Sequence, residues 1–267
     1  MAGDIKRLKL SGLGNTRDLG GIPVAGGGIA YGKLIRSGHL FKLRKSTVKK
    51  LEEMCVKTVI DFRTEQEASE KPDTALRGAT YINLSLLSAG ALGVTFEQNT
   101  ERSLKELGDE ILKKYSSPDE YMERIYDGIL FEKQSLENLA TALNILVETD
   151  GCVLFHCTGG KDRAGVFAML IESLLGLDEE TILLDYAATG EFQKRRNRLV
   201  RLFSALMPFS RNANKLLLEL LKTNPKHIET AISKLKANYG SVTDYCKSAL
   251  GVTDDDIAVL KKKYLVD

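Results

Sequence analysis

The organisation of this chain follows from one stretch of its sequence, Val153-Leu154-Phe155-His156-Cys157-Thr158-Gly159-Gly160-Lys161-Asp162-Arg163-Ala164-Gly165. A short apolar run leads to a His-Cys pair, two glycines follow, and an arginine stands where a helical pattern of apolar residues begins. An apolar run of this kind predicts a central parallel strand that is covered on both faces. The stretch therefore predicts a strand, a tight loop and a helix in succession.

The loop between this strand and helix has the residues of an anion-binding site. Cys157 and Arg163 are separated by five residues, and the first backbone N–H groups of a helix have no partner within it. A phosphate-sized dianion fits such a cradle, and Gly159 and Gly160 allow the backbone to curl. Helix N-termini and cations stabilise the thiolate form of a cysteine, which makes Cys157 the candidate nucleophile.

The side chains after Cys157 supply the other parts of a phosphoryl-transfer site. Arg163 has a planar fork of donors that suits two phosphoryl oxygens, and these oxygens carry the charge in the transition state. Lys161 adds a second cation, and Asp162 places a carboxyl group beside the leaving oxygen. We predict that the phosphoryl group is held by the Arg163 guanidinium and by backbone N–H groups of six residues: Thr158, Gly159, Gly160, Lys161, Asp162 and Arg163.

The loop sequence HCTGGKDRAG resembles the active-site loop of the cysteine-dependent protein-tyrosine and dual-specificity phosphatases. Its Lys-Asp-Arg form is similar to the bacterial tyrosine and phosphoinositide phosphatases of the secreted mycobacterial and listerial type. The resemblance implies a metal-independent hydrolase that forms a phosphocysteine intermediate and needs no cofactor. It extends to four further stretches: NTRDLGG at Asn15–Gly21, YGKLIRSGHL at Tyr31–Leu40, TVIDFRTEQE at Thr58–Glu67, and the tail at Tyr239–Leu265.

The identity of the general acid is a choice between two aspartates. The resemblance favours Asp162, because the family carries an aspartate at that place in the loop. Asp61 follows a predicted strand, at the edge where α/β sheets bind ligands, and is the second candidate. Asp61 can instead pair with Arg63 and anchor its own loop. The Trp-Pro-Asp acid loop of the eukaryotic enzymes is absent, because the chain has no tryptophan.

Three further positions bear on the mechanism and the substrate. His156 is expected to support the loop through hydrogen bonds rather than to act as a base. Ala164 stands where the family usually has serine or threonine, whose hydroxyl stabilises the departing thiolate, so we expect the phosphocysteine to break down slowly. A cation at Lys161 is common in phosphatases of phosphoinositides and also occurs in bacterial phosphotyrosine phosphatases. Phosphotyrosine, phosphoserine, phosphothreonine and phosphoinositides therefore all remain candidate substrates.

Two other classes of protein share single features with this loop. Rhodanese-like enzymes and arsenate reductases also use a looped cysteine, but they lack the combination of His-Cys with Lys-Asp-Arg. Arsenate reductases need a resolving cysteine, and Cys152 would lie about 16 Å from Cys157 on an extended strand, beyond the ~7 Å reach of a disulfide. A phosphate-recognition module without turnover would not need Cys157, Asp162 and Arg163 together.

Composition and charge exclude several classes of function. The chain is 43% hydrophobic and 28% charged, as in soluble globular proteins, and its net charge of +2 does not indicate a nucleic-acid partner. Its four cysteines have no CxxC spacing, so no metal site is predicted. No signal peptide or membrane span is evident, which makes the cytoplasm the default location, although leaderless secretion would leave no trace. The oligomeric state is left open.

The order of predicted strands and helices along the sequence predicts a single domain of α/β class over residues 1–267. Its core is a protein-tyrosine-phosphatase-like sheet, mostly parallel and flanked by helices. Residues 85–130 are predicted to form a cap insertion, and residues 178–267 a helical C-terminal part with a lid. Strands are expected at 57–60, 80–84 and 152–155. Helices are expected at 46–54, 100–115, from 118, at 134–148, from 163 to a cap at Gly176, at 178–188, 191–203, 212–222 and 225–239, and after N-caps at Ser241 and Thr253.

Two groups of charged residues allow a structural or a functional interpretation. Arg17, Asp18 and Arg36 stand between apolar residues, which indicates a buried ion pair that ties down the N-terminal hairpin; the resemblance places this segment near the floor of the active site. The helix at 191–203 is rich in cations. This face is either simply solvated or belongs to a lid that attracts phosphorylated substrates or acidic lipid headgroups. Its cations are Lys194, Arg195, Arg196, Arg198 and Arg201.

Overall fold

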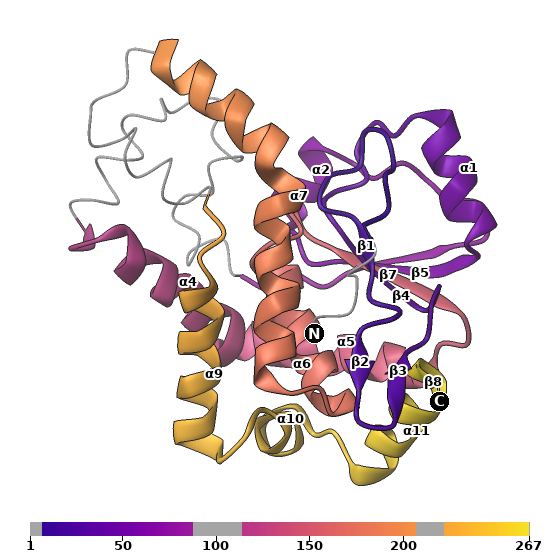
Figure 1. Ribbon diagram of the computed structural model, residues 1–267, viewed down its shortest axis with the longest axis vertical. Helices are drawn as coiled ribbons and strands as arrows, with labels where there is room; N and C mark the ends of the chain where they lie inside the picture. Colours follow the sequence, from indigo (N-terminus) through magenta and orange to yellow (C-terminus); the bar gives the residue numbers. More distant parts are fainter. Residues whose placement is uncertain (1–6, 88–113, 207–221, 267) are drawn as a thin grey trace.

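A five-stranded sheet forms the centre of the computed structural model, which describes residues 7–87, 114–206 and 222–266 (Figure 1). Its order is β1-β4-β7-β5-β6, and only β1 runs antiparallel to its neighbour. The predicted α/β fold with a mostly parallel sheet flanked by helices is therefore confirmed, with β7 in the middle. The strands are β1 (Arg17–Asp18), β4 (Leu34–Ser37), β5 (Val56–Asp61), β6 (Thr80–Asn83) and β7 (Cys152–His156).

A second, three-stranded sheet joins the two ends of the chain. It consists of β2 (Pro23–Val24), β3 (Gly27–Ile29) and β8 (Leu265–Val266), all antiparallel. The predicted glycine-rich hairpin near the N-terminus is thus paired with the C-terminal strand, which holds the N-terminal segment against the domain.

Most helices begin where the sequence places capping residues. The Ser117 hydroxyl accepts from the Glu120 N–H with Pro118 at the first helical position, and Ser241 and Thr253 cap their helices as predicted. Gly176 ends the helix that follows the loop with φ 93°. The described helices are α1 (Lys45–Glu53), α2 (Glu65–Glu70), α4 (Pro118–Phe131), α5 (Lys133–Glu148), α6 (Arg163–Leu175), α7 (Glu179–Leu206), α9 (Pro225–Tyr239), α10 (Val242–Leu250) and α11 (Asp254–Tyr264).

Strand β7 is buried on both faces, as its apolar run predicts. Val153 and Phe155 belong to the larger core, in which Phe155 packs edge-on against Phe167 of α6 at a ring distance of 5.2 Å. Leu154 faces the smaller core with Leu51 of α1. Figure 1 shows α1 and α6 on opposite sides of the sheet. The loop after β7 therefore begins from a strand that is fixed from both sides.

Helix α7 corrects one prediction, because a single helix replaces the two expected at 178–188 and 191–203. The break was placed at Thr189-Gly190, but an isolated glycine costs only about 1 kcal/mol in a helix and does not end it. Tertiary contacts outweigh that cost. Thr189 is buried, and its hydroxyl accepts a hydrogen bond from Arg17 of β1 at 3.2 Å.

The cap and the lid stay predictions. The expected loop at 88–94, most of the helix at 100–115 and most of the helix at 212–222 lie outside the described residues. Helix α4, which ends the proposed cap segment, contributes Ile125, Tyr126 and Ile129 to the larger core. Of the cations on α7, Lys194 and Arg198 are exposed. Among the helices that the structure describes, none combines the length and apolar character of a membrane span.

The continuity of α7 can be tested by replacing Gly190 with alanine. A Cβ at this position would lie 3.5 Å from the Thr223 Cβ, an ordinary contact. Gly190→Ala should therefore raise the unfolding free energy by about 0.5–1 kcal/mol in urea denaturation. Gly176→Ala is the control and should destabilise the protein, because its φ of 93° is unfavourable for alanine. Destabilisation by both variants would indicate that α7 is broken at Gly190.

Candidate active site

The backbone carbonyl groups of the loop are held by donors that lie outside it. Because the C=O of one residue and the N–H of the next point in opposite directions across a trans peptide, outward carbonyls turn the following N–H groups inward. This orientation is the one that an anion cradle requires. The donors are His39 N to Thr158 O (3.3 Å), Gln193 Nε2 to Gly159 O (2.7 Å), Asn15 Nδ2 to Gly160 O (2.7 Å), and Arg36 to Gly160 O (3.0 Å) and Lys161 O (2.9 Å).

Gly160 confirms the need for glycine in this curl. Its φ is 64°, and an added Cβ would stand 2.5 Å from the carbonyl oxygen of Ser37 at the end of β4. Any side chain here would push the loop away from the strand and from its Arg36 donor.

Arg36 is fixed by an acid that the sequence did not reveal. Its Nη1 donates to Asp185 of α7 at 2.7 Å, and Arg17 donates to the same carboxylate with Nε at 2.7 Å and Nη2 at 2.9 Å. The expected buried ion pair exists, but Asp185 rather than Asp18 is its acid. Asp18 instead accepts from the backbone of Gly20 and Gly32 and stabilises the N-terminal hairpin.

Arg163 begins α6 and is held in place by Glu67 of α2. Its two terminal nitrogens donate to the two Glu67 oxygens at 2.6 and 2.8 Å, and Nη2 also donates to the Thr158 hydroxyl at 3.2 Å. Burial raises the pKa of Glu67, but the hydrogen bonds and charge of Arg163 outweigh burial and, with Thr158, lower the pKa to about 2. Glu67 was missed, although Thr64-x-x-Glu67 has the spacing of a capping box, which the structure contains.

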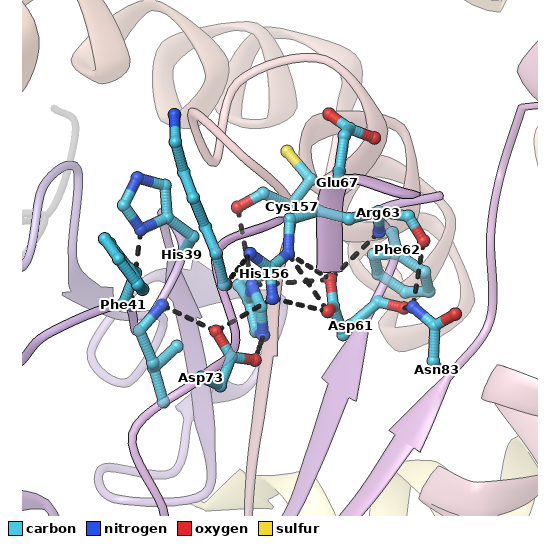
Figure 2. A network of polar contacts seen from close by, with 12 residues as sticks. His39, Phe41, Asp61, Phe62, Arg63, Glu67, Asp73, Asn83, His156 and Cys157 are labelled. Atoms are coloured by element: carbon cyan, nitrogen blue, oxygen red, sulfur yellow. Dashed lines mark hydrogen bonds and ion pairs between the residues drawn. The ribbon is translucent and has the colours of Figure 1, made fainter. Parts of the chain in front are cut away.

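The Asp61 carboxylate is committed to Arg63. Arg63 donates to it with Nε at 2.9 Å and Nη2 at 2.7 Å, and donates to Asp73 at 2.9 Å. His156 lies beneath the loop, with Nε2 2.8 Å from an Asp73 oxygen and Nδ1 3.4 Å from the Cys157 carbonyl. Figure 2 shows the Cys157 sulfur pointing away from this network, toward the side where the Glu67 carboxylate lies.

The same network has the residue types of a metal site. Ligand atoms of Asp61, Asp73 and His156 all lie within 4.8 Å of one another. However, the Arg63 guanidinium bonds both carboxylates and offsets one of their two negative charges. A metal ion would have to displace this cation, so the donor set does not fit one while Arg63 is in place.

Asp162 is the last residue of the loop before α6, and its side chain is 28% exposed. Tyr126 of α4 donates a hydrogen bond to its Oδ1 at 2.9 Å, and the ammonium of Lys161 lies 3.6 Å from its Oδ2. The Lys161 ammonium also donates to the carbonyl of Lys222 at 3.1 Å. The structure thus gathers Cys157, Arg163, Lys161 and Asp162 in one loop, with Asp61 directed elsewhere.

The low pKa of Glu67 predicts a pH dependence of stability. A carboxylate whose pKa is depressed from 4.5 to about 2 contributes stability that is complete above pH 4.5 and is lost as the pH falls toward 2. In urea denaturation between pH 6 and 2, wild type should lose on the order of 3 kcal/mol relative to Glu67→Gln. Glu65→Gln, an exposed change on the same helix, should follow wild type. A constant difference between wild type and Glu67→Gln would contradict the assignment.

Comparisons with known proteins agree on one family. A model described as the tyrosine phosphatase family matches residues 8–266. A Cupriavidus necator protein, provisionally named a tyrosine-protein phosphatase, is 28% identical over 263 residues, which cover 97% of this chain and 88% of that protein. A tyrosine-protein phosphatase of Nostoc commune is 28% identical over 160 residues, or 59% of this chain and 48% of that protein.

One solved structure shares a more distant likeness. It is Pseudomonas aeruginosa TpbA, crystallised as a cysteine-to-serine variant with phosphotyrosine; it is 15% identical and covers 58% of this chain and 67% of its own, with a TM-score of 0.29. A score this low carries no argument about the site. The family model matches nearly the whole chain, so the protein belongs to the tyrosine phosphatase family and is a hydrolase of the tyrosine-phosphatase type.

Proposed function

We propose that this protein hydrolyses phosphotyrosine through a phosphocysteine intermediate on Cys157. The observation that carries the proposal is the loop geometry, in which the carbonyls of residues 158–161 are all held outward around a buried cysteine. Arg163 is presented at the same loop by Glu67. This arrangement would provide a nucleophile, inward N–H groups and a fixed cation for a phosphoryl group, which supports the proposal.

The proposed reaction has two steps. The Cys157 thiolate attacks phosphorus and the bond to the tyrosine oxygen breaks, while Asp162 gives that oxygen a proton. Water then attacks the phosphocysteine, Asp162 takes a proton from the water, and inorganic phosphate leaves with the thiolate restored. Asp162 is preferred to Asp61 because Asp162 lies in the loop and is partly exposed, whereas the Asp61 carboxylate is bonded to Arg63.

Other phosphorylated substrates are also candidates. Lys161 places a second cation in the loop, which would suit the extra phosphates of a phosphoinositide. Exposed Lys194 and Arg198 on α7 would suit an acidic lipid surface. A substrate panel should therefore contain phosphotyrosine, phosphoserine and phosphothreonine peptides, together with phosphoinositides in vesicles.

The assignment of nucleophile and acid is tested by two variants. Cys157→Ser should abolish turnover and the trapping of labelled phosphate on the protein. Asp162→Asn should lower kcat/KM, which reports phosphoryl transfer to Cys157 rather than the later breakdown of the phosphocysteine, by about 10²–10⁴-fold for phenyl phosphate, whose leaving group is poor. The loss should be much smaller for para-nitrophenyl phosphate, whose leaving group needs little protonation.

Asp61→Asn is the matched control for the acid. It should act mainly on stability, because it leaves Arg63 with one carboxylate fewer. Full activity of Asp162→Asn toward phenyl phosphate, with loss in Asp61→Asn, would reverse the acid assignment. Labelled phosphate that binds but is never trapped or released as product would identify a phosphate-recognition module instead.

The residue after Arg163 predicts which step is slow. Ala164 is buried and has no hydroxyl to stabilise the thiolate as the phosphocysteine breaks. Rapid mixing with para-nitrophenyl phosphate should therefore show a burst of nitrophenol equal to the enzyme concentration. Ala164→Ser should reduce the burst and raise the steady-state rate. A wild-type trace that is linear from time zero would contradict slow breakdown.

A further inference from the structure

Two buried tyrosines from different helices are connected by hydrogen bonds to the carboxyl group of Asp162. The Tyr126 hydroxyl of α4 donates to Asp162 Oδ1 at 2.9 Å, and it lies 2.6 Å from the Tyr186 hydroxyl of α7. Both side chains are almost completely buried. Burial raises the pKa of Tyr126 and of Tyr186, and the nearby Asp162 adds to both effects, so both phenols keep their protons.

The number of available protons fixes the direction of the hydrogen bonds that connect Tyr186, Tyr126 and Asp162. Each phenol has one proton to donate, and the Tyr126 proton goes to Asp162, since a carboxylate oxygen can only accept. Tyr186 must therefore donate to Tyr126, which in turn strengthens Tyr126 as a donor. With Oδ1 occupied as an acceptor, Oδ2, which lies 3.6 Å from the Lys161 ammonium, is the oxygen of Asp162 that can carry a transferable proton.

Gly165, at the end of the loop sequence, leaves the space that Tyr186 occupies. A Cβ on Gly165, in the first turn of α6, would lie 3.1 Å from the Tyr186 ring and 2.7 Å from Arg36 Nη2. Tyr186 therefore packs directly against the backbone that follows the loop, and its ring fixes the position of its hydroxyl relative to Asp162.

We propose that Tyr126 and Tyr186 are positioning residues that orient Asp162 so that its Oδ2 delivers the proton. The inference rests on the proposed function of Asp162 as general acid and adds two residues that act through it. A tether on one oxygen matters because proton transfer requires a donor held within hydrogen-bond reach of the leaving oxygen. These two hydrogen bonds also make the orientation of the Asp162 carboxyl group depend on the packing of α4 and α7.

The test compares leaving groups in variants that each remove one hydroxyl. Tyr126→Phe should lower kcat/KM for phenyl phosphate by about tenfold and kcat/KM for para-nitrophenyl phosphate by less than about twofold. A hydrogen bond to a carboxylate favours its charged form, so its loss should also move the alkaline limb of the phenyl phosphate profile up by about one pH unit. Tyr186→Phe should show the same pattern with a smaller change, because Tyr126 can still donate to Asp162.

Tyr245→Phe is the matched control. The Tyr245 hydroxyl is buried and donates to the Leu130 carbonyl of the same helix α4 at 2.6 Å, far along the chain from the loop. This variant should lose stability but keep the wild-type ratio of the two substrates and the wild-type pH profile. An equal change of that ratio in Tyr245→Phe and Tyr126→Phe would show that only the packing of α4 matters, and would overturn the proposal.

A double variant separates this inference from the proposed function. If Tyr126 acts through Asp162, adding Tyr126→Phe to Asp162→Asn should cause no further loss with phenyl phosphate. Full additivity, or an unchanged rate in Tyr126→Phe when Asp162→Asn is strongly impaired, would overturn the tyrosine chain alone. An unimpaired Asp162→Asn variant would overturn both the acid assignment and the chain.

Discussion

The hydrogen bonds from Arg36 to the Gly160 and Lys161 carbonyls are the interaction on which the site depends. A buried carbonyl without a donor costs about 1–3 kcal/mol, so the loop adopts the orientation in which its carbonyls reach their donors. Across each trans peptide, the same orientation turns the following N–H group to the inner side of the loop. The proposed phosphate cradle is therefore set by the donors behind the loop.

Two acids, each paired with arginine, perform different tasks at the site. Asp185 forms ion pairs with both Arg17 and Arg36 and so keeps the Arg36 donors behind the loop, and Glu67 fixes Arg163 at the start of α6. Removing one partner of a buried pair leaves an uncompensated charge and typically costs 3–5 kcal/mol. Both pairs join segments far apart in sequence, which explains why the N-terminal strand and α7 support the proposed active site together with the loop itself.

The sequence allowed the strand, loop and helix to be predicted because their signals are local: an apolar run, two glycines and a C-terminal glycine cap. The need for glycine at Gly160 and the capped starts of the later helices were predictable for the same reason, because their signals are also local. Asp185, Glu67 and Tyr126 were missed because their partners lie 36 to 168 residues away along the chain. Such contacts leave no local pattern, and the single helix α7 reflects tertiary packing that outweighs a local weakness at Gly190.

The central claim is that Arg36 shapes the cradle from behind, and vanadate affinity measures this most directly. Arg36→Lys keeps the charge but replaces the three nitrogens with which Arg36 donates to the two carbonyls and to Asp185 by a single nitrogen. Vanadate binding to the folded variants can be measured by isothermal titration calorimetry, with Arg77→Lys as the exposed control. Vanadate should bind at least about tenfold more weakly to Arg36→Lys alone, because the loss of one hydrogen bond to a charged group is worth that much. Equal affinity in wild type and Arg36→Lys would contradict the account.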